Sequence, residues 1–196
     1  MQWIEKKGLE LYGGHFRIIE SDHPVIYRLI AYFLQDEQAA FQFGLDLGKG
    51  ILLAGPVGCG KTSLMNIMKY LTPMEHKFTV KPCRDISFEF INDGYKIIHD
   101  YSKDSRYRGG NLVAAKYCFD DLGIENSLKY YGNECNVMAE VLLGRYDCYV
   151  SKKIPTHITT NLSASEIEQH YGIRVRSRLR ELCNLIAFDN KTKDKR

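Results

Sequence analysis

GPVGCGKTS, at residues 55–63, is the most informative stretch of this 196-residue chain. It follows a short apolar run, GILLA at 50–54, and precedes a helix-like stretch, LMNIMKYL at 64–71. Glycine lets the backbone curl until successive N–H groups point into one hollow. A helix that begins there presents the positive end of its dipole to the same hollow. The order strand, glycine-rich loop, helix therefore predicts an anion-binding turn.

Four residues of this stretch, Gly55, Gly60, Lys61 and Thr62, fit the complete pattern G-x-x-x-x-G-K-[ST]. In this pattern lysine reaches the β- and γ-phosphates and the hydroxyl binds Mg²⁺. We therefore expect a site for ATP or ADP with Mg²⁺. The predicted cofactor-binding residues are Gly55, Pro56, Val57, Gly58, Cys59, Gly60, Lys61, Thr62 and Ser63. The alternative, a glycine-rich turn without a ligand, is disfavoured by the strand before it and the helix after it.

Cys59 occupies a position that the pattern leaves free. A thiol at a helix N-terminus can be reactive, because the dipole stabilises its thiolate. A tolerated small residue is the simpler interpretation, and we favour it.

Two acids follow the second buried strand, AAKYCFDDLG at 114–123. A phosphate-binding loop needs a carboxylate from a neighbouring strand to hold magnesium. We predict that Asp120 holds Mg²⁺ through waters, together with Thr62, because Mg²⁺ keeps much of its hydration. Asp121 is then the candidate that polarises the attacking water, although an aspartate reaches less far than a glutamate and favours slow hydrolysis. The alternative is a solvated turn at the end of the strand.

The wider pattern predicts the fold class. Apolar or β-branched runs near residues 51, 79, 117, 157 and 186 predict five strands, and helix-like segments lie between them. This alternation is typical of an α/β layer fold. We therefore expect a P-loop NTPase three-layer sandwich with a five-stranded, mostly parallel sheet.

Local signals give further predictions for the connecting segments. In chain order they are a short extended segment over 11–19 with a turn at 13–14, a helix beginning at SDHP (21–24), a helix over 85–102 weakened by Gly94, a polar and basic loop over 102–111, and helices at 163–171 and 173–182, the first with a capping box.

The composition is that of a soluble globular protein, with 44% apolar and 26% charged residues. A net charge of +3 permits a nucleic-acid partner without arguing for one. None of the six cysteines forms a C-x-x-C pair, which disfavours zinc. The sequence shows no secretory signal and no apolar run long enough to span a membrane. We expect a cytoplasmic protein with free thiols and no membrane partner.

The order of motifs resembles a known family. Residues 55–62, with proline second and glycine fourth, resemble the AAA+ branch of P-loop ATPases. Asp120-Asp121-Leu122-Gly123 resembles the Walker B strand end of the DnaC/IstB group, which contains helicase loaders and transposition helper ATPases. Further resemblances are Gly144-Arg145-Tyr146 to an R-Y pair, Thr159-Thr160-Asn161-Leu162 to the sensor 1 strand, and Arg174-Val175-Arg176-Ser177-Arg178-Leu179 to the box VII helix. They cover about residues 48–189.

This resemblance implies roles for three residues. Asn161 would lie beside the γ-phosphate and orient water; the alternative is a turn residue before the helix that follows. Arg178 would act as an arginine finger toward the γ-phosphate of a neighbouring subunit, which implies a homo-oligomer. Arg174, four residues earlier on the same helix face, is the second candidate. For either arginine the alternative is a solvated basic face.

The resemblance also implies a division of the chain. An N-terminal helical segment at 1–47 would pack on an AAA+ core at 48–190, and a charged tail would follow at 191–196. The helical lid with its sensor 2 arginine is absent from the expected core. Little sequence precedes residue 20, whereas relatives often carry an extension there that binds a helicase or transposase. This departure weakens the prediction of helicase loading.

A basic segment with tyrosines raises the question of direct DNA binding. Its residues are Tyr101, Lys103, Arg106, Tyr107, Arg108 and Lys116. Such a mixture suits single-stranded nucleic acid, because charge follows the backbone and rings stack on bases. An ordinary connecting loop explains it equally simply, and we favour the loop.

The leading hypothesis is an Mg-dependent ATPase of the DnaC/IstB-like AAA+ type, an accessory factor in DNA replication or mobile-element transposition. A second hypothesis is a nucleotide-dependent interaction module with little hydrolysis. A third is a P-loop small-molecule kinase, with the arginines at 174–180 acting as a basic lid.

Overall fold

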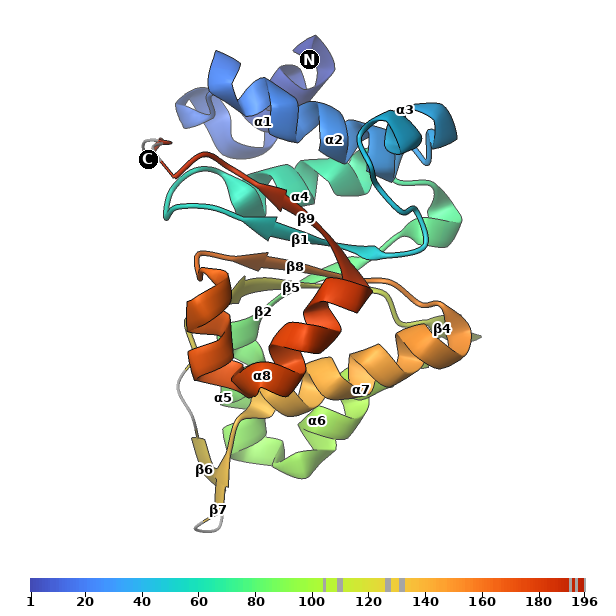
Figure 1. Cartoon of the computed structure of the whole chain (residues 1–196), viewed down its shortest axis with the longest axis vertical. Coiled ribbons are helices and arrows are strands. Elements are labelled where there is room, and N and C mark those ends of the chain that lie inside the picture. Colours follow the sequence, from blue (N-terminus) through green and yellow to red (C-terminus); the bar gives the residue numbers. More distant parts are fainter. Residues whose placement is uncertain are drawn as a thin grey trace.

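The computed structural model describes residues 1–103, 105–108, 111–125, 128–130, 133–190, 192 and 194–195. A five-stranded parallel sheet runs through the molecule (Figure 1). Its strands are β1 (Gly50–Ala54), β2 (Thr79–Pro82), β5 (Tyr117–Leu122), β8 (Thr156–Thr160) and β9 (Cys183–Ala187), in the order β2-β5-β8-β1-β9. Each of the five predicted strands is present. The predicted α/β fold class is confirmed.

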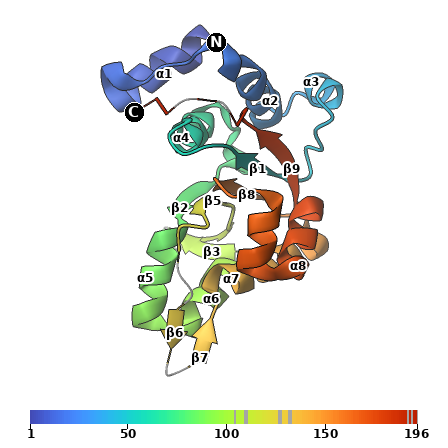
Figure 2. The ribbon, with the colours of Figure 1, turned by 60° about the vertical axis from the view of Figure 1, so that its left-hand side comes forward.

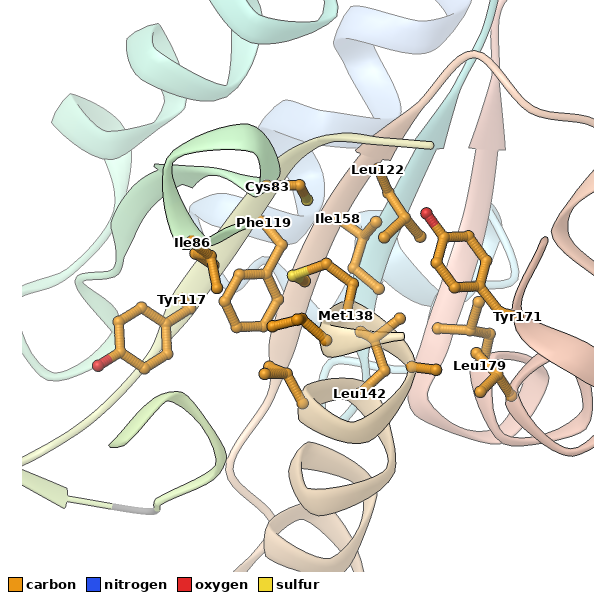
Figure 3. Packing of buried hydrophobic residues seen from close by; sticks show 14 of the residues in the cluster. Cys83, Ile86, Tyr117, Phe119, Leu122, Met138, Leu142, Ile158, Tyr171 and Leu179 are labelled. Atoms are coloured by element: carbon orange, nitrogen blue, oxygen red, sulfur yellow. The ribbon is translucent and has the colours of Figure 1, made fainter. Parts of the chain in front are cut away.

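The central strands β1, β5 and β8 are largely buried, whereas the edge strand β2 is only partly buried. Side chains alternate between the faces along a strand. Ile51 and Leu53 of β1 belong to one buried cluster, whereas Leu52 packs against the other. In β5, Phe119 faces the second cluster and Cys118 the first. Figure 3 shows the second cluster, where β5 and β8 meet the helices below them.

Helices cover each face. The first cluster is covered by α1 (Gln2–Tyr12), α2 (His23–Phe33), α3 (Glu37–Gln42) and α4 (Lys61–Leu71), and the second by α5 (Cys83–Asp93), α6 (Tyr95–Ser102), α7 (Val137–Lys152) and α8 (Ala164–Leu182). Short 3₁₀ turns η1 (Gly13–His15), η2 (Glu20–Asp22) and η3 (Met74–His76), and the hairpins β3 (Ser105–Arg108) with β4 (Asn111–Ala114) and β6 (Leu128–Tyr130) with β7 (Asn133–Cys135), complete the described elements. Both α1 and α2 pack on α4, and the C-terminus lies beside α1 (Figures 1 and 2).

Three local predictions need correction. The extended segment predicted over 11–19 is wrong at its start, because α1 continues to Tyr12; the predicted turn is present as the 3₁₀ turn Gly13–His15, and Phe16 and Ile19 after it are extended. Helix α1 contains Gly8, and glycine is a weak helix former. The helix is held in place by tertiary packing, because Ile4 is buried in the core and the ring of Phe16 packs against Gly8. The helix predicted over 85–102 is broken into α5 and α6 at Gly94, where φ is +61°.

The third correction concerns a later connection. The predicted loop at 102–111 contributes to a hairpin, β3 with β4. The two helices predicted at 163–171 and 173–182 are confirmed: they share the label α8, but Gly172 divides them with a non-helical backbone (φ +85°, ψ 161°). The capping box that starts α8 is confirmed, because the Ser163 hydroxyl accepts from the Glu166 amide and the Glu166 carboxylate accepts from the Ser163 amide. Among the described residues, no helix has the length and apolar character needed to cross a bilayer.

Candidate nucleotide site

The phosphate loop joins β1 to α4 and lines a cavity of about 480 Å³. Gly60, with φ of +99°, is the residue before the helix, and Gly58 has φ of +76°. Side chains other than glycine are strained at such angles, so both glycines are needed for the curl of the loop. Residues 57–63 all line the cavity, whereas Gly55 and Pro56 lie behind it and contribute carbonyl groups.

Lys61 is 4% exposed and its ammonium group has three oxygen acceptors. The Nζ atom donates to the carbonyl oxygens of Gly55 and Pro56, both at 2.8 Å, and to Oδ1 of Asn161 at 2.5 Å. An ammonium has three protons, so these contacts use its full donor capacity. A phosphate entering the loop therefore has to replace at least one of them. Asn161, at the end of β8, lines the same cavity.

Asp120 is held by hydroxyl groups from two neighbouring elements. The Thr62 Oγ1 atom lies 3.1 and 3.0 Å from its two carboxylate oxygens, and Thr159 Oγ1 donates to Oδ1 at 2.7 Å. Asp120 is 5% exposed. Burial raises the pKa of its carboxyl group, and the nearby Asp121 adds to the rise, while hydrogen bonds from both hydroxyls and the charge of Lys61 oppose it.

Asp121 reaches the cavity because β5 is irregular at the two acids. The register of β5 against β8 shifts between Phe119 and Leu122, and Asp121 has a left-handed φ of +55°. Neighbouring residues of a regular strand point to opposite faces. Here Asp121 lines the cavity beside Asp120, and its N–H donates to Thr159 Oγ1 at 2.9 Å. Thr159 thus fixes both acids, a role that the sequence did not predict.

The donor set suits a hard cation. Thr62 and Asp120 offer a hydroxyl and a carboxylate, the oxygen ligands that Mg²⁺ accepts while it keeps waters and phosphate oxygens. Thr62 and Asp120 already lie within hydrogen-bond distance of each other. They therefore fit a Mg²⁺ ion that is held by few protein atoms.

The two candidate arginines do not line this cavity. Arg178 NH1 donates to the Tyr146 hydroxyl at 2.9 Å, and its guanidinium lies 4.2 Å from the centre of that ring. The same arginine is 3.5 Å from the carboxylate of Glu181, which accepts from the Tyr146 hydroxyl at 2.6 Å. Arg174 is exposed. Within one chain, neither arginine is brought to the phosphate loop.

Sequence reasoning missed the wall that faces the phosphate loop. Its residues outside the loop are Tyr12, His15, Phe16, Arg17, Ile18, Asp22, Ile26, Ile124 and Lys195. Most belong to the N-terminal segment, where the only sequence signal is a cluster of aromatic and apolar residues after α1. The signal does not say what they contact.

Cys59 is fully buried, and burial raises the pKa of its thiol despite the opposing charge of Lys61. This environment supports the interpretation as a tolerated small residue and argues against a reactive thiolate.

The basic segment is only partly described. The Tyr101 hydroxyl donates a hydrogen bond to Glu89 at 2.8 Å, and its ring packs edge-on against Tyr117. The ring therefore takes part in the packing of the fold. Lys116 donates to the Glu75 carbonyl at 2.6 Å, and Lys103 is exposed. The side chains of Arg106, Tyr107 and Arg108 lie outside the described part, as do residues 191, 193 and 196 of the tail. Direct DNA binding therefore stays a prediction.

Known proteins resemble this chain in sequence and in structure. No protein-family model matches the chain. Over 139 residues, 71% of the chain, it is 28% identical to ATPase family gene 2 protein homolog B of Bos taurus, and it spans 17% of that protein's length.

Solved structures match more of the chain. The DnaC helicase loader superimposes with a TM-score of 0.58 and 20% identity over 96% of this chain and 100% of its own. DnaI gives 0.58 and 17% over 96% and 94%, and AMPPCP-bound DnaA from Aquifex aeolicus gives 0.57 and 16% over 90% and 50%. These structures confirm the α/β fold that the sequence predicted.

Proposed function

We propose that this chain binds Mg·ATP and hydrolyses it in an assembly whose neighbouring copies share each active site. One observation carries the proposal: Lys61, Thr62, Asp121 and Asn161, which follow or end three neighbouring strands, line one cavity, and Asp120 is hydrogen-bonded to Thr62 at its edge. The similarity to DnaC, DnaI and DnaA supports a replication-related ATPase class. A role in helicase loading or transposition, with DNA and a helicase or transposase as partners, is the proposed setting.

The residues divide the reaction between them. Backbone N–H groups of the loop would bind the α- and β-phosphates, and Lys61 would exchange its carbonyl contacts for β- and γ-phosphate oxygens. Magnesium, when bound, would neutralise charge on the phosphates. Asp120 would accept hydrogen bonds from the waters of that ion, while Asp121 polarises the attacking water and Asn161 orients it.

Arg178 would complete the site of a neighbouring copy. Arg178 contacts Tyr146 of α7 and Glu181 of α8, and its side chain stays 42% exposed. An exposed guanidinium can exchange such contacts at low cost, because surface ion pairs contribute little. Arg174 is the second candidate.

The direct test measures ATP turnover against protein concentration, with and without single-stranded DNA. We expect turnover per chain to rise with concentration, because each site needs a neighbour. Lys61→Ala should abolish nucleotide binding, whereas Lys96→Ala, an exposed lysine on α6, should not. Unchanged ATP affinity in the Lys61 variant would rule out the mechanism.

A mixing experiment tests the shared site. Arg178→Ala should bind ATP but lose turnover by about three orders of magnitude, the effect of a missing arginine finger. Arg180→Ala, an exposed arginine of the same helix, is the matched control. Mixing Arg178→Ala with Lys61→Ala should restore turnover, since one supplies intact loops and the other intact fingers. Wild-type turnover in Arg178→Ala alone would exclude the role.

The second candidate function is a nucleotide-dependent interaction module with little hydrolysis. The short side chain of Asp121 at the water-polarising position favours it. Tight ATP binding together with turnover that neither DNA nor concentration raises would select the module over the ATPase.

A further inference from the structure

Asp22 is an acidic residue buried in the cavity wall. It is 1% exposed and ends the 3₁₀ turn Glu20–Asp22. Its Oδ2 atom accepts from the Ile19 amide at 3.0 Å and from Lys195 Nζ at 2.5 Å, while Oδ1 is buried with no hydrogen-bond partner among the described residues. A carboxylate removed from water is costly unless a cation accompanies it. Lys195 is the cation that makes this burial tolerable.

Lys195 also binds the phosphate loop. Its backbone N–H donates to the Gly58 carbonyl at 3.2 Å, and its ammonium donates to the Cys59 carbonyl at 3.0 Å. The tail packs directly on the loop, since a Cβ atom built on Gly58 would lie 2.0 Å from the Asp194 carboxylate. Both hydrogen bonds from Lys195 to the loop are accepted by carbonyl oxygens, so neither of them occupies a loop N–H group.

The contact with Cys59 has a consequence for the opposite side of the loop. The carbonyl of Cys59 and the N–H of Gly60 belong to one peptide group, and Gly60 lines the cavity. A cation on the oxygen of a peptide group polarises it and makes its N–H a stronger donor. Lys195 can therefore act on a bound phosphate through this peptide group, although it also lines the cavity itself.

We propose that Asp22 and Lys195 are a positioning pair for the nucleotide: Asp22 fixes Lys195 on the outer carbonyls of the phosphate loop, and Lys195 strengthens the loop as a phosphate receptor. The inference rests on the proposed nucleotide-binding function and adds a residue pair to it. It also makes docking of the tail and binding of nucleotide reinforce each other, since coupling between two binding events is reciprocal.

The test uses the full chain and four variants. Lys195→Met removes the charge and keeps the stem, Lys195→Arg keeps the charge, and Asp22→Asn removes the partner. Lys96→Met is the matched control, an equal change of charge at an exposed site on α6. Dissociation constants for ATP and ADP are measured by calorimetry.

We expect Lys195→Met to raise both constants about tenfold, a typical coupling. The ratio of ATP to ADP affinity should stay unchanged, because the loop binds the phosphates that both nucleotides share. Lys195→Arg should recover most of the loss, which a purely structural role of the tail would not require. Asp22→Asn should weaken binding similarly; if it fails to fold, the lysine variants alone decide.

Reciprocity gives a second measurement. Saturating ATP should slow amine labelling of Lys195 in the wild-type chain, measured by mass spectrometry, and not in Lys61→Ala. If Lys195→Met binds ATP as tightly as Lys96→Met does, or more tightly, the proposed role of Asp22 and Lys195 is wrong. If the wild-type chain binds no ATP at all, the proposed function fails instead.

Discussion

The two sides of the nucleotide cavity are built differently. On the phosphate side, hydrogen bonds join Lys61 to Asn161 and Asp120 to both Thr62 and Thr159 across three strands. The facing wall mixes aromatic and aliphatic side chains with the charged residues Arg17, Asp22 and Lys195. Its rings contact each other and its buried acid contacts the tail. The first side cannot shift without disturbing the sheet, whereas the second can. We infer that the phosphate side anchors the nucleotide and governs the chemistry, whereas the wall adds to affinity alone.

Protonation of His157 should have the largest effect, because this residue of β8 is buried in the core that supports both sides. It is 2% exposed, its Nδ1 accepts from the Ile51 amide at 3.1 Å, and rings of Tyr32, Phe33 and Phe78 surround it. Burial lowers its pKa to about 3. The folded state thus keeps the ring neutral, while the unfolded chain binds a proton near pH 6.5. The contribution to stability is complete above pH 6.5 and is lost as pH falls toward 3.

Urea unfolding at a series of pH values checks this prediction. We expect His157 alone to cost about 3 kcal/mol of unfolding free energy between pH 6.5 and about pH 4. His157→Asn keeps an acceptor for the Ile51 amide and cannot take up the proton. The variant should be less stable at neutral pH but should decline less steeply on acidification. Equal slopes would show that other groups cause the decline.

Asp120→Asn should have the next largest effect, confined to the phosphate side. Asparagine keeps the shape and an acceptor for Thr62 but loses the charge that holds the metal. Turnover with Mg²⁺ should fall on the order of 100-fold, while ATP affinity in EDTA stays close to wild type. Kinetics with and without Mg²⁺ measure both.

Ile18→Ala on the wall is the opposite case. It should raise KM and leave kcat unchanged, because an interaction equal in the ground and transition states changes binding alone. If Ile18→Ala lowers kcat as Asp120→Asn does, the division between the two sides is wrong.

The same division explains how far the sequence could predict the site. The phosphate loop and the acid pair are local patterns, and the sheet brings them together because the ends of parallel strands meet at one edge. The wall depends on contacts between distant positions, such as Asp22 with Lys195, which no local pattern encodes. The bulge that turns Asp121 into the cavity depends on the pairing of β5 with β8.

Gly8→Ala should have the smallest effect, and it tests the wall from behind. In a helix interior, alanine is ordinarily more favourable than glycine by about 1 kcal/mol. Here a Cβ atom on Gly8 would lie 2.1 Å from the ring of Phe16, a cavity residue, so the ring has to move. We expect the Kd for ATP to rise about threefold, with kcat unchanged.

Gly14→Ala is the control, since a Cβ atom there would meet nothing within 4 Å. Fluorescence titration with a labelled ATP compares the three proteins. A Gly8 variant that binds like the Gly14 variant would mean that Phe16 can leave its place without consequence. The nucleotide would then be held by the phosphate side alone, and the wall would only shield it from water.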